Sequence, residues 1–137
     1  EEQKRRFLPE IAAGRLKVSI AFTEAGGGTD VLGAMRTSAV RADGGWILNG
    51  EKMWSSASQV ADYLLTLVRT DKNVEKKHHG ISVFFVPAKQ KGITITPLTK
   101  LGMRAIGSCT VNFEDVFVPD DLVLGSLFDN SSNQRFR

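Results

Sequence analysis

The sequence has little of what marks several large classes of protein. Its 137 residues include one cysteine, Cys109, which excludes an internal disulfide framework. No apolar run approaches the ~18 residues that a membrane-spanning helix needs. The 18 basic and 15 acidic residues leave a net charge of +3, which is too mild to argue for nucleic-acid binding. The chain also lacks an initial methionine and a signal peptide, so we expect it to be a piece of a longer protein.

The composition and the order of residue types predict one folded domain that begins with a helix. Hydrophobic residues make up 42% of the chain, enough for a buried core. Good helix formers fill residues 1–13, where Pro9 is expected to divide the helix into two pieces and Gly14 to end the second. We expect residues 1–14 to end a helical region, residues 15–125 to form a β-domain and residues 126–137 to be a polar tail.

Short segments rich in β-branched and aromatic residues follow at near-regular spacing. They occupy residues 17–22, 35–41, 46–48, 62–69, 81–86, 92–96 and 110–118. Two glycine-containing turn signals, Asp43-Gly44-Gly45 and Asn49-Gly50, and a charged loop at 71–79 separate some of them. This pattern predicts an all-β fold: a closed or nearly closed antiparallel β-barrel of six to eight strands after a short helical lead-in.

The cluster Gly26-Gly27-Gly28 follows the first expected strand and precedes Thr29 and Asp30. Three glycines allow positive φ angles, and successive amides in such a turn form a nest for an anion such as a pyrophosphate. The cluster is neither a dinucleotide fingerprint nor a P-loop, because the further glycine of one and the Gly-Lys-Ser/Thr of the other are missing. From the residues alone, a flexible turn remains the simpler interpretation. Asp30 is expected to cap a single helical turn that follows it.

Five motifs in the same order resemble those of the acyl-CoA dehydrogenases. Residues 21–30 are similar to the family signature TEPGAGSD, and residues 49–54 resemble NGxKxW. Residues 92–93, 100–104 and 113–119 resemble the family's GI, KLGxR and FEDVxVP segments. Five collinear matches over about residues 1–125 are far more specific than any one of them. The resemblance identifies the chain as the middle β-barrel domain of this family.

The resemblance implies a chemistry and a set of partners. Members bind FAD and acyl-CoA between the barrel and a helical C-terminal domain. A glutamate removes the α-proton of the thioester, the β-hydrogen leaves as hydride to the flavin, and electrons pass to an electron-transfer flavoprotein. Because members are usually tetrameric, the parent protein is expected to be a homo-oligomer, and its compartment stays open between the bacterial cytoplasm and the mitochondrial matrix. The acyl chain length lies beyond what these residues specify.

The resemblance also assigns roles to individual residues. Phe22 and Thr23 correspond to contacts with the isoalloxazine ring, Gly28 and Thr29 to the approach of the FAD pyrophosphate, and Thr29 also to the acyl-CoA. The segment Trp54-Ser55-Ser56 matches the family's Trp-x-Ser/Thr, with Trp54 beside the ring and the Ser56 hydroxyl near flavin N5. The sequence departs from the signature at Ala25, where a proline is usual, and at Thr29, where a serine is usual. Trp54 could equally be an ordinary core aromatic.

No catalytic base and no metal site are expected within this chain. Its tempting carboxylates each fit a turn, a strand edge or a cap, and nothing in the sequence pairs them for proton transfer: Glu24, Glu51, Glu114 and Asp115. The isolated chain is therefore expected to be inactive. The alternatives are an acyl-CoA oxidase or a flavin monooxygenase on the same scaffold, and a flavin-free β-barrel interaction module.

Overall fold

The computed structural model describes residues 1–76 and 79–125, so the polar tail expected at 126–137 lies outside the described residues. The elements, in chain order, are α1 (Glu2–Ala12), β1 (Val18–Ala21), β2 (Ser38–Ala42), β3 (Gly45–Ser56), η1 (Ser58–Val60), β4 (Tyr63–Arg69), β5 (Ile81–Pro87), β6 (Ile93–Pro97), β7 (Ser108–Pro119), η2 (Asp120–Leu122) and β8 (Val123–Leu124). The mostly β character and the helical lead-in are confirmed.

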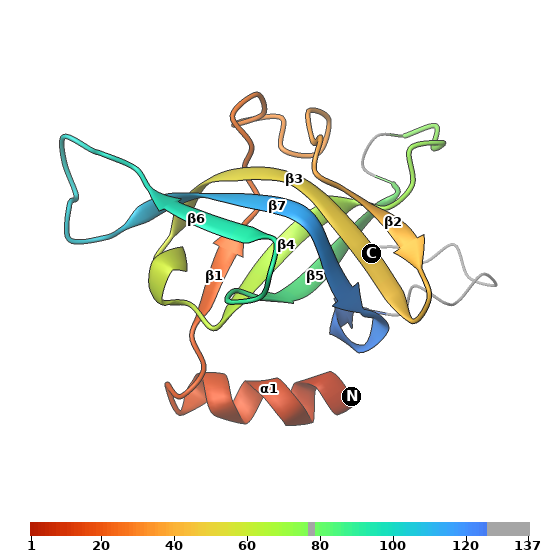
Figure 1. The fold of residues 1–137 in the computed structure, drawn as a ribbon, viewed down its shortest axis with the longest axis horizontal. Coiled ribbons are helices and arrows are strands. Elements are labelled where there is room, and N and C mark those ends of the chain that lie inside the picture. Colours follow the sequence, from red (N-terminus) through yellow and green to blue (C-terminus); the bar gives the residue numbers. More distant parts are fainter. Residues whose placement is uncertain (77–78, 126–137) are drawn as a thin grey trace.

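The eight strands form one curved sheet that is not closed. Its order is β6-β7-β3-β2-β4-β5-β8, with β1 paired to β4 off this path, so the prediction of a barrel is only partly confirmed. In Figure 1, β6, β7 and β3 cross in front of β1, β4 and β5. Apolar side chains from both layers meet in one core, which includes Leu48 and Val111 in front and Leu64 and Phe84 behind. The spacing of strands gives their approximate number, but closure depends on pairing between the edge strands, which no local pattern encodes.

The strands also depart from the antiparallel expectation. β1 pairs with β4 in parallel, through Val18–Ala21 against Tyr63–Thr66. β2 meets the same strand in parallel at its other end, through Ser38 and Arg69. The remaining pairs are antiparallel. Because β1 and β2 lie along successive parts of β4, the connection 22–37 leaves the sheet between them and returns.

Two local predictions are wrong. Pro9 lies inside a single continuous α1, because a proline removes only one helix hydrogen bond and Arg5, whose carbonyl loses its partner, is exposed to water. Asn49-Gly50 is not a turn but part of the 12-residue β3. Gly50 adopts φ +141 at a bulge, where an added Cβ would lie 2.6 Å from the Cα atom of Thr37. Close approach to Thr37, rather than a turn, explains this glycine.

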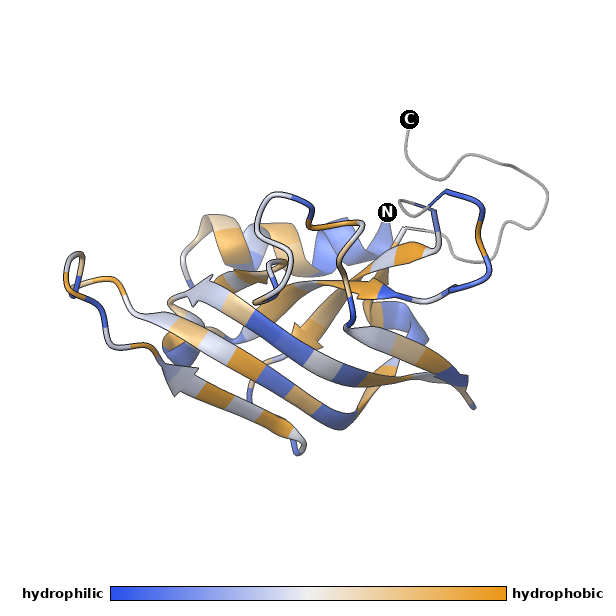
Figure 2. Cartoon of the chain, turned by 90° about the horizontal axis from the view of Figure 1, so that it is seen from above, coloured by the Kyte–Doolittle hydropathy of each residue, from blue (hydrophilic) through white to orange (hydrophobic). Residues whose placement is uncertain are grey.

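Other local predictions are confirmed. Gly14, with a positive φ, follows Ala13, the residue that caps the end of α1, and the two-residue turn Asp43-Gly44 joins β2 to β3. Figure 2 shows hydrophobic and hydrophilic residues alternating along several strands, as expected where one face of a strand meets the core. The helix α1 covers β4 and β5 through Phe7, whose ring packs edge-on against Tyr63 and Phe85.

Candidate functional site

One cavity of about 320 Å³ lies where the end of β3 passes β1. We call it the Trp54 cavity. Its lining comes from β1, from the residues just after it and from the end of β3: Val18, Ser19, Ile20, Phe22, Thr23, Met53, Trp54 and Ser56. Four of the residues assigned by resemblance therefore lie together, although two of them are more than thirty positions from the others in the sequence. The cavity combines aromatic faces with hydroxyl groups.

The backbone near the end of β3 turns Trp54 outward. The pairing of β3 with β7 is interrupted between Lys52 and Ser55, and Trp54 adopts φ 63 within that irregularity. A hydrogen bond of 2.8 Å from the Met53 amide to the Thr23 carbonyl attaches β3 to the segment after β1. As a result, 55% of Trp54 is exposed. The interpretation of Trp54 as an ordinary core aromatic is therefore wrong.

A buried ion pair holds the start of the loop between β1 and β2. Lys52, whose side chain is fully buried, donates to the Glu24 carboxylate at 2.8 Å and to the Phe22 carbonyl at 3.2 Å. Glu24 also accepts the backbone amides of Arg36 and Thr37, at 2.7 and 3.0 Å. Glu24 thus joins both ends of the loop to the middle of β3, and it positions Phe22 and Thr23 indirectly.

The surroundings lower the pKa values of both members of this pair, but for different reasons. Burial alone would raise the pKa of the Glu24 carboxyl, but the hydrogen bonds from Lys52, Arg36 and Thr37 outweigh it and lower that pKa below its ordinary value. Burial lowers the pKa of Lys52, and the Glu24 carboxylate offsets only part of that effect. Glu24 is therefore an anion that three neighbouring donors hold in place.

The glycine loop lies apart from the Trp54 cavity. Gly28 and Thr29 are exposed, and neither lines the cavity. None of Gly26, Gly27 and Gly28 has a positive φ, so that part of the nest interpretation is wrong. Gly27 is needed for close packing, because an added Cβ would lie 2.8 Å from that of Ala34. Around Gly28 there is open space, which leaves its backbone accessible to a ligand. Asp30 caps the following turn through the Gly33 amide at 2.9 Å, as predicted.

Ser55 lies between two cavity-lining residues but points away from them. Its side chain is 1% exposed, and its hydroxyl has no hydrogen-bond partner among the residues that the structure describes. Its partner in the sheet is Cys109, which is also buried. Any contact of Ser55 with a ligand in the Trp54 cavity would have to use its backbone. The hydroxyls of Thr23 and Ser56 differ, because both residues line the cavity.

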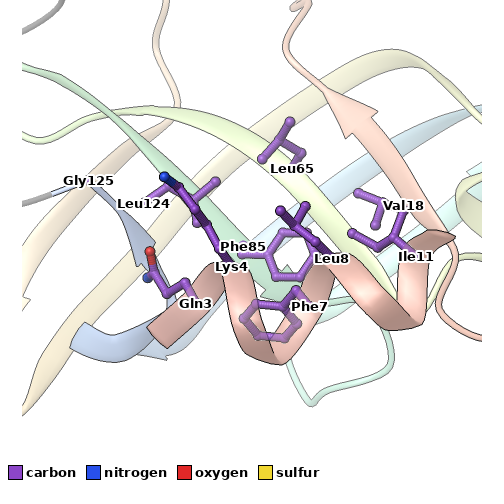
Figure 3. A pocket seen from close by; sticks show the side chains of 10 residues that line it. All are labelled: Gln3, Lys4, Phe7, Leu8, Ile11, Val18, Leu65, Phe85, Leu124 and Gly125. Atoms are coloured by element: carbon purple, nitrogen blue, oxygen red, sulfur yellow. The ribbon is translucent and has the colours of Figure 1, made fainter. Parts of the chain in front are cut away.

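A second cavity, of about 430 Å³, lies between α1 and the sheet. Figure 3 shows its lining, which is almost entirely hydrocarbon from Phe7, Leu8, Ile11, Leu65 and Phe85. We call it the α1 groove. Among the residues that the structure describes, Gln3 and Lys4 are the only polar side chains that line it. It offers apolar surface but few groups that could fix the orientation of a ligand.

Among residues 1–76 and 79–125, no group of three or more histidine, cysteine, aspartate or glutamate side chains has the geometry of a metal site. No helix in the same residues is both long and apolar enough to cross a membrane.

Sequence reasoning missed the roles of Lys52, Ser19 and Ser58. A lysine in a strand is usually solvated, and no local signal reveals that its partner is a glutamate 28 positions earlier. Its place within the motif at 49–54 was the available clue. Ser19 and Ser58 are ordinary residues in sequence, and only the fold brings their hydroxyls to within 2.8 Å of each other.

Comparison with known proteins connects this geometry to a family. Residues 19–116 match the family model described as acyl-CoA dehydrogenase, middle domain. The chain belongs to the acyl-CoA dehydrogenase family. The match includes both segments that build the Trp54 cavity, together with the loop between β1 and β2 and the sheet as far as β7.

Individual acyl-CoA dehydrogenases resemble the chain over most of its length. Acyl-CoA dehydrogenase FadE26 of Mycobacterium tuberculosis is 46% identical over 121 residues, which are 87% of this chain and 30% of that protein. In the solved ChsE4–ChsE5 complex of the same species, one chain is 44% identical, with a TM-score of 0.83 over 92% of this chain and 32% of its own. A glutaryl-CoA dehydrogenase of Mycobacterium smegmatis, solved in complex with FADH2, is 34% identical, with a TM-score of 0.79 over 90% of this chain and 30% of its own. The chain thus spans about a third or less of these relatives' length.

Proposed function

We propose that the full-length protein containing this chain is an FAD-dependent acyl-CoA dehydrogenase, and that the Trp54 cavity is one wall of its flavin site. A single observation carries the proposal: a half-exposed tryptophan and the hydroxyl-bearing residues Thr23 and Ser56 converge on one cavity. The membership of the chain in the family supports the same assignment.

The residues of the cavity fit an isoalloxazine ring. The ring is flat and aromatic, with carbonyl and nitrogen atoms along its edges. Trp54 and Phe22 offer aromatic surface for its face, and the hydroxyls of Thr23 and Ser56 can donate to its polar edge. When bound, FAD supplies the acceptor for the hydride that leaves the β-carbon of the thioester. The Ser56 hydroxyl would stabilise negative charge that develops on the ring. Ser55 would contribute only backbone groups.

The exposed residues Gly28 and Thr29 of the glycine loop are proposed to contact the FAD pyrophosphate and the acyl-CoA. Gly28 has open space around it, so a pyrophosphate could approach its backbone closely. The Thr29 hydroxyl is exposed beside it and could donate to the pyrophosphate or to the acyl-CoA. In the glutaryl-CoA dehydrogenase solved with FADH2, the corresponding domain is about 30% of the chain. By analogy, other domains would complete the site.

The base that removes the α-proton is proposed to lie outside these 137 residues. Within the described residues, Glu24 is occupied by Lys52 and two backbone amides, and Asp115 is paired with Asn49. Neither carboxylate lines the Trp54 cavity. The isolated chain should therefore fail to reduce a dye with acyl-CoA. Electron-transfer flavoprotein is proposed as the acceptor for the full-length enzyme, which we expect to assemble as a tetramer.

Anaerobic spectroscopy of the full-length protein tests the proposal. Purified with added FAD, it should be yellow, and an acyl-CoA from a panel of straight and branched thioesters should bleach the flavin absorbance and yield the enoyl-CoA. Rapid oxygen consumption with the same substrate would instead indicate an oxidase. NADPH-dependent oxygenation would indicate a monooxygenase. A protein that stays colourless with excess FAD would contradict the proposal and favour the flavin-free interaction module.

A further inference from the structure

The segment from Met53 to Ala57 is bent in an unfavourable conformation. Trp54 has φ 63 and Ala57 has φ 59, and neither is a glycine. Side chains crowd the backbone in this left-handed region, so such conformations persist only where the surroundings hold them. Two backbone hydrogen bonds fix the ends of the segment: the Met53 amide donates to Thr23, and the Ala57 amide donates to Gly107 at 2.6 Å. The middle of the segment needs another support.

Two buried serine hydroxyls provide that support. Ser19 on β1 and Ser58 in η1 are 2% and 1% exposed, and their Oγ atoms are 2.8 Å apart. The Ser19 hydroxyl donates to the Ser56 carbonyl at 2.7 Å. The Ser58 hydroxyl lies 3.2 Å from the Ser55 carbonyl. Both carbonyls belong to the bent segment, so the two serines hold the middle of the segment through hydrogen bonds.

The direction of these hydrogen bonds follows from counting protons. A serine hydroxyl has one proton to donate. The Ser19 proton goes to the Ser56 carbonyl, so the proton shared by the two hydroxyls comes from Ser58. That proton is also directed toward the Ser55 carbonyl, at the longer distance. The result is a chain from Ser58 through Ser19 to Ser56, in which loss of either hydroxyl weakens the whole.

We propose that Ser19 and Ser58 are positioning residues that hold Trp54 and Ser56 in the orientation needed to contact the ligand of the Trp54 cavity. The identity of that ligand as a flavin rests on the proposed function; the mechanical role of the two serines does not. Without the hydroxyls, the Ser56 carbonyl loses a partner and the bent segment can relax toward ordinary backbone angles. Local opening of the segment then breaks the Met53–Thr23 and Ala57–Gly107 hydrogen bonds more often, while the rest of the sheet stays folded.

The test compares three variants of the full-length protein, Ser19→Ala, Ser58→Ala and the double variant, with Ser82→Ala as a matched control. Ser82 is 5% exposed and forms the same kind of hydroxyl pair, at 2.8 Å from Thr70, but it does not line the Trp54 cavity. Any general cost of removing a buried serine hydroxyl therefore appears in the control as well. Hydrogen–deuterium exchange of peptides covering residues 53–57 reports on the segment with or without a flavin.

The expected result is an exchange rate of the Met53 and Ala57 amides about 10-fold higher in Ser19→Ala and in Ser58→Ala, and unchanged in Ser82→Ala. The double variant should exchange no faster than the single variants, because both serines act through one chain of bonds. In the flavin-loaded protein, the same variants should shift the visible absorbance and lower kcat more than they change KM. If Ser19→Ala is insoluble, Ser58→Ala carries the test.

Failure of this inference can be separated from failure of the proposed function. If the unaltered protein binds no flavin, the proposed function fails, while the exchange measurement still decides the role of the serines. If the protein is yellow but Ser19→Ala and Ser58→Ala match Ser82→Ala in exchange and in absorbance, the positioning role is overturned. Additive effects in the double variant would also contradict it.

Discussion

Two cavities of the domain, the α1 groove and the Trp54 cavity, share Val18 in their linings but differ in what they can do. The α1 groove is the larger, at about 430 Å³, and is lined almost wholly by carbon. The Trp54 cavity, at about 320 Å³, adds hydroxyls and backbone polar groups to aromatic faces. Apolar surface attracts ligands without orienting them, whereas a few converging polar groups fix an orientation. The smaller cavity is therefore the better candidate for a site of chemistry.

The backbone that supports each cavity also differs, being regular beside the α1 groove and irregular beside the Trp54 cavity. The α1 groove rests on a regular helix and regular strands, held by an aromatic cluster in which Tyr63 stacks on Phe85 at a centroid distance of 4.5 Å. The Trp54 cavity rests on an interrupted strand with two left-handed residues and a buried ion pair. Irregular backbone is costly and is retained where it aims a side chain. Mutations beside the Trp54 cavity should accordingly affect ligand binding, whereas mutations beside the α1 groove should affect stability alone.

The largest expected effect on the Trp54 side comes from Lys52→Ala. Removal of the ammonium leaves Glu24 largely buried without its counter-charge, which should cost about 3–5 kcal/mol of stability. The loop between β1 and β2 should loosen, and FAD affinity should fall with it. Thermal unfolding and flavin titration of the full-length protein measure both. Lys91→Ala, at an exposed lysine, is the control, and equal behaviour of the two variants would refute the anchoring role.

On the other side, Phe7→Ala should lower stability by about 3 kcal/mol, because this 6%-exposed ring joins α1 to Tyr63 and Phe85. FAD affinity of the folded protein should stay the same, since Phe7 does not line the Trp54 cavity. Flavin titration well below the melting temperature separates the two quantities. A large loss of FAD affinity in folded Phe7→Ala would contradict the assignment of flavin binding to the Trp54 cavity alone.

Acid should act on the Trp54 side through Glu24. Its pKa in the folded protein lies below the ordinary value of 4.5, so its stabilising contribution is fully present above 4.5 and is lost as the pH falls through the folded value. Glu24→Gln should therefore be less stable than the unaltered protein at neutral pH, and the difference should shrink below pH 4.5. Melting temperatures at a series of pH values show this. Glu51→Gln, at an exposed carboxylate, is the control for the loss of one negative charge, and equal behaviour of the two variants would contradict this role of Glu24.

The smallest expected effect belongs to Ser55→Ala. The hydroxyl is buried without a partner among the described residues, so its loss should change stability by less than about 1 kcal/mol. FAD affinity should be unchanged, because only the backbone of Ser55 is available to the cavity. A marked loss of flavin in this variant would show that the side chain contributes after all.

The sequence predicted the features that depend on neighbouring residues and failed at those that depend on residues distant in the chain. Local chemistry predicted the turn at Asp43-Gly44-Gly45, the cap at Asp30 and the end of the helical segment at Gly14, and all three are present. It failed at Asn49-Gly50, where a tertiary approach to Thr37 decides the conformation. Closure of the sheet and the parallel pairing of β1 with β4 also depend on distant partners.

The candidate site also contains features that the sequence predicted and features that depend on distant contacts. Resemblance named Phe22, Thr23, Trp54 and Ser56, and the structure brings these four into one cavity. Resemblance could not show that the Ser55 hydroxyl points inward, because neighbouring residues in a family motif share no common direction. Nor could it reveal the pairing of Glu24 with Lys52 or of Ser19 with Ser58, since each joins residues far apart in the chain.

The central claim, that the ligand meets the Trp54 cavity rather than the α1 groove, is tested most directly by one titration. Trp54 and Leu8 are each 55% exposed and each lines one of the two cavities. Full-length apoprotein carrying Trp54→Ala or Leu8→Ala is titrated with FAD. Trp54→Ala should weaken binding about 10-fold through the lost aromatic contact, and Leu8→Ala should leave it unchanged. Weaker binding in Leu8→Ala with unchanged binding in Trp54→Ala would contradict the account.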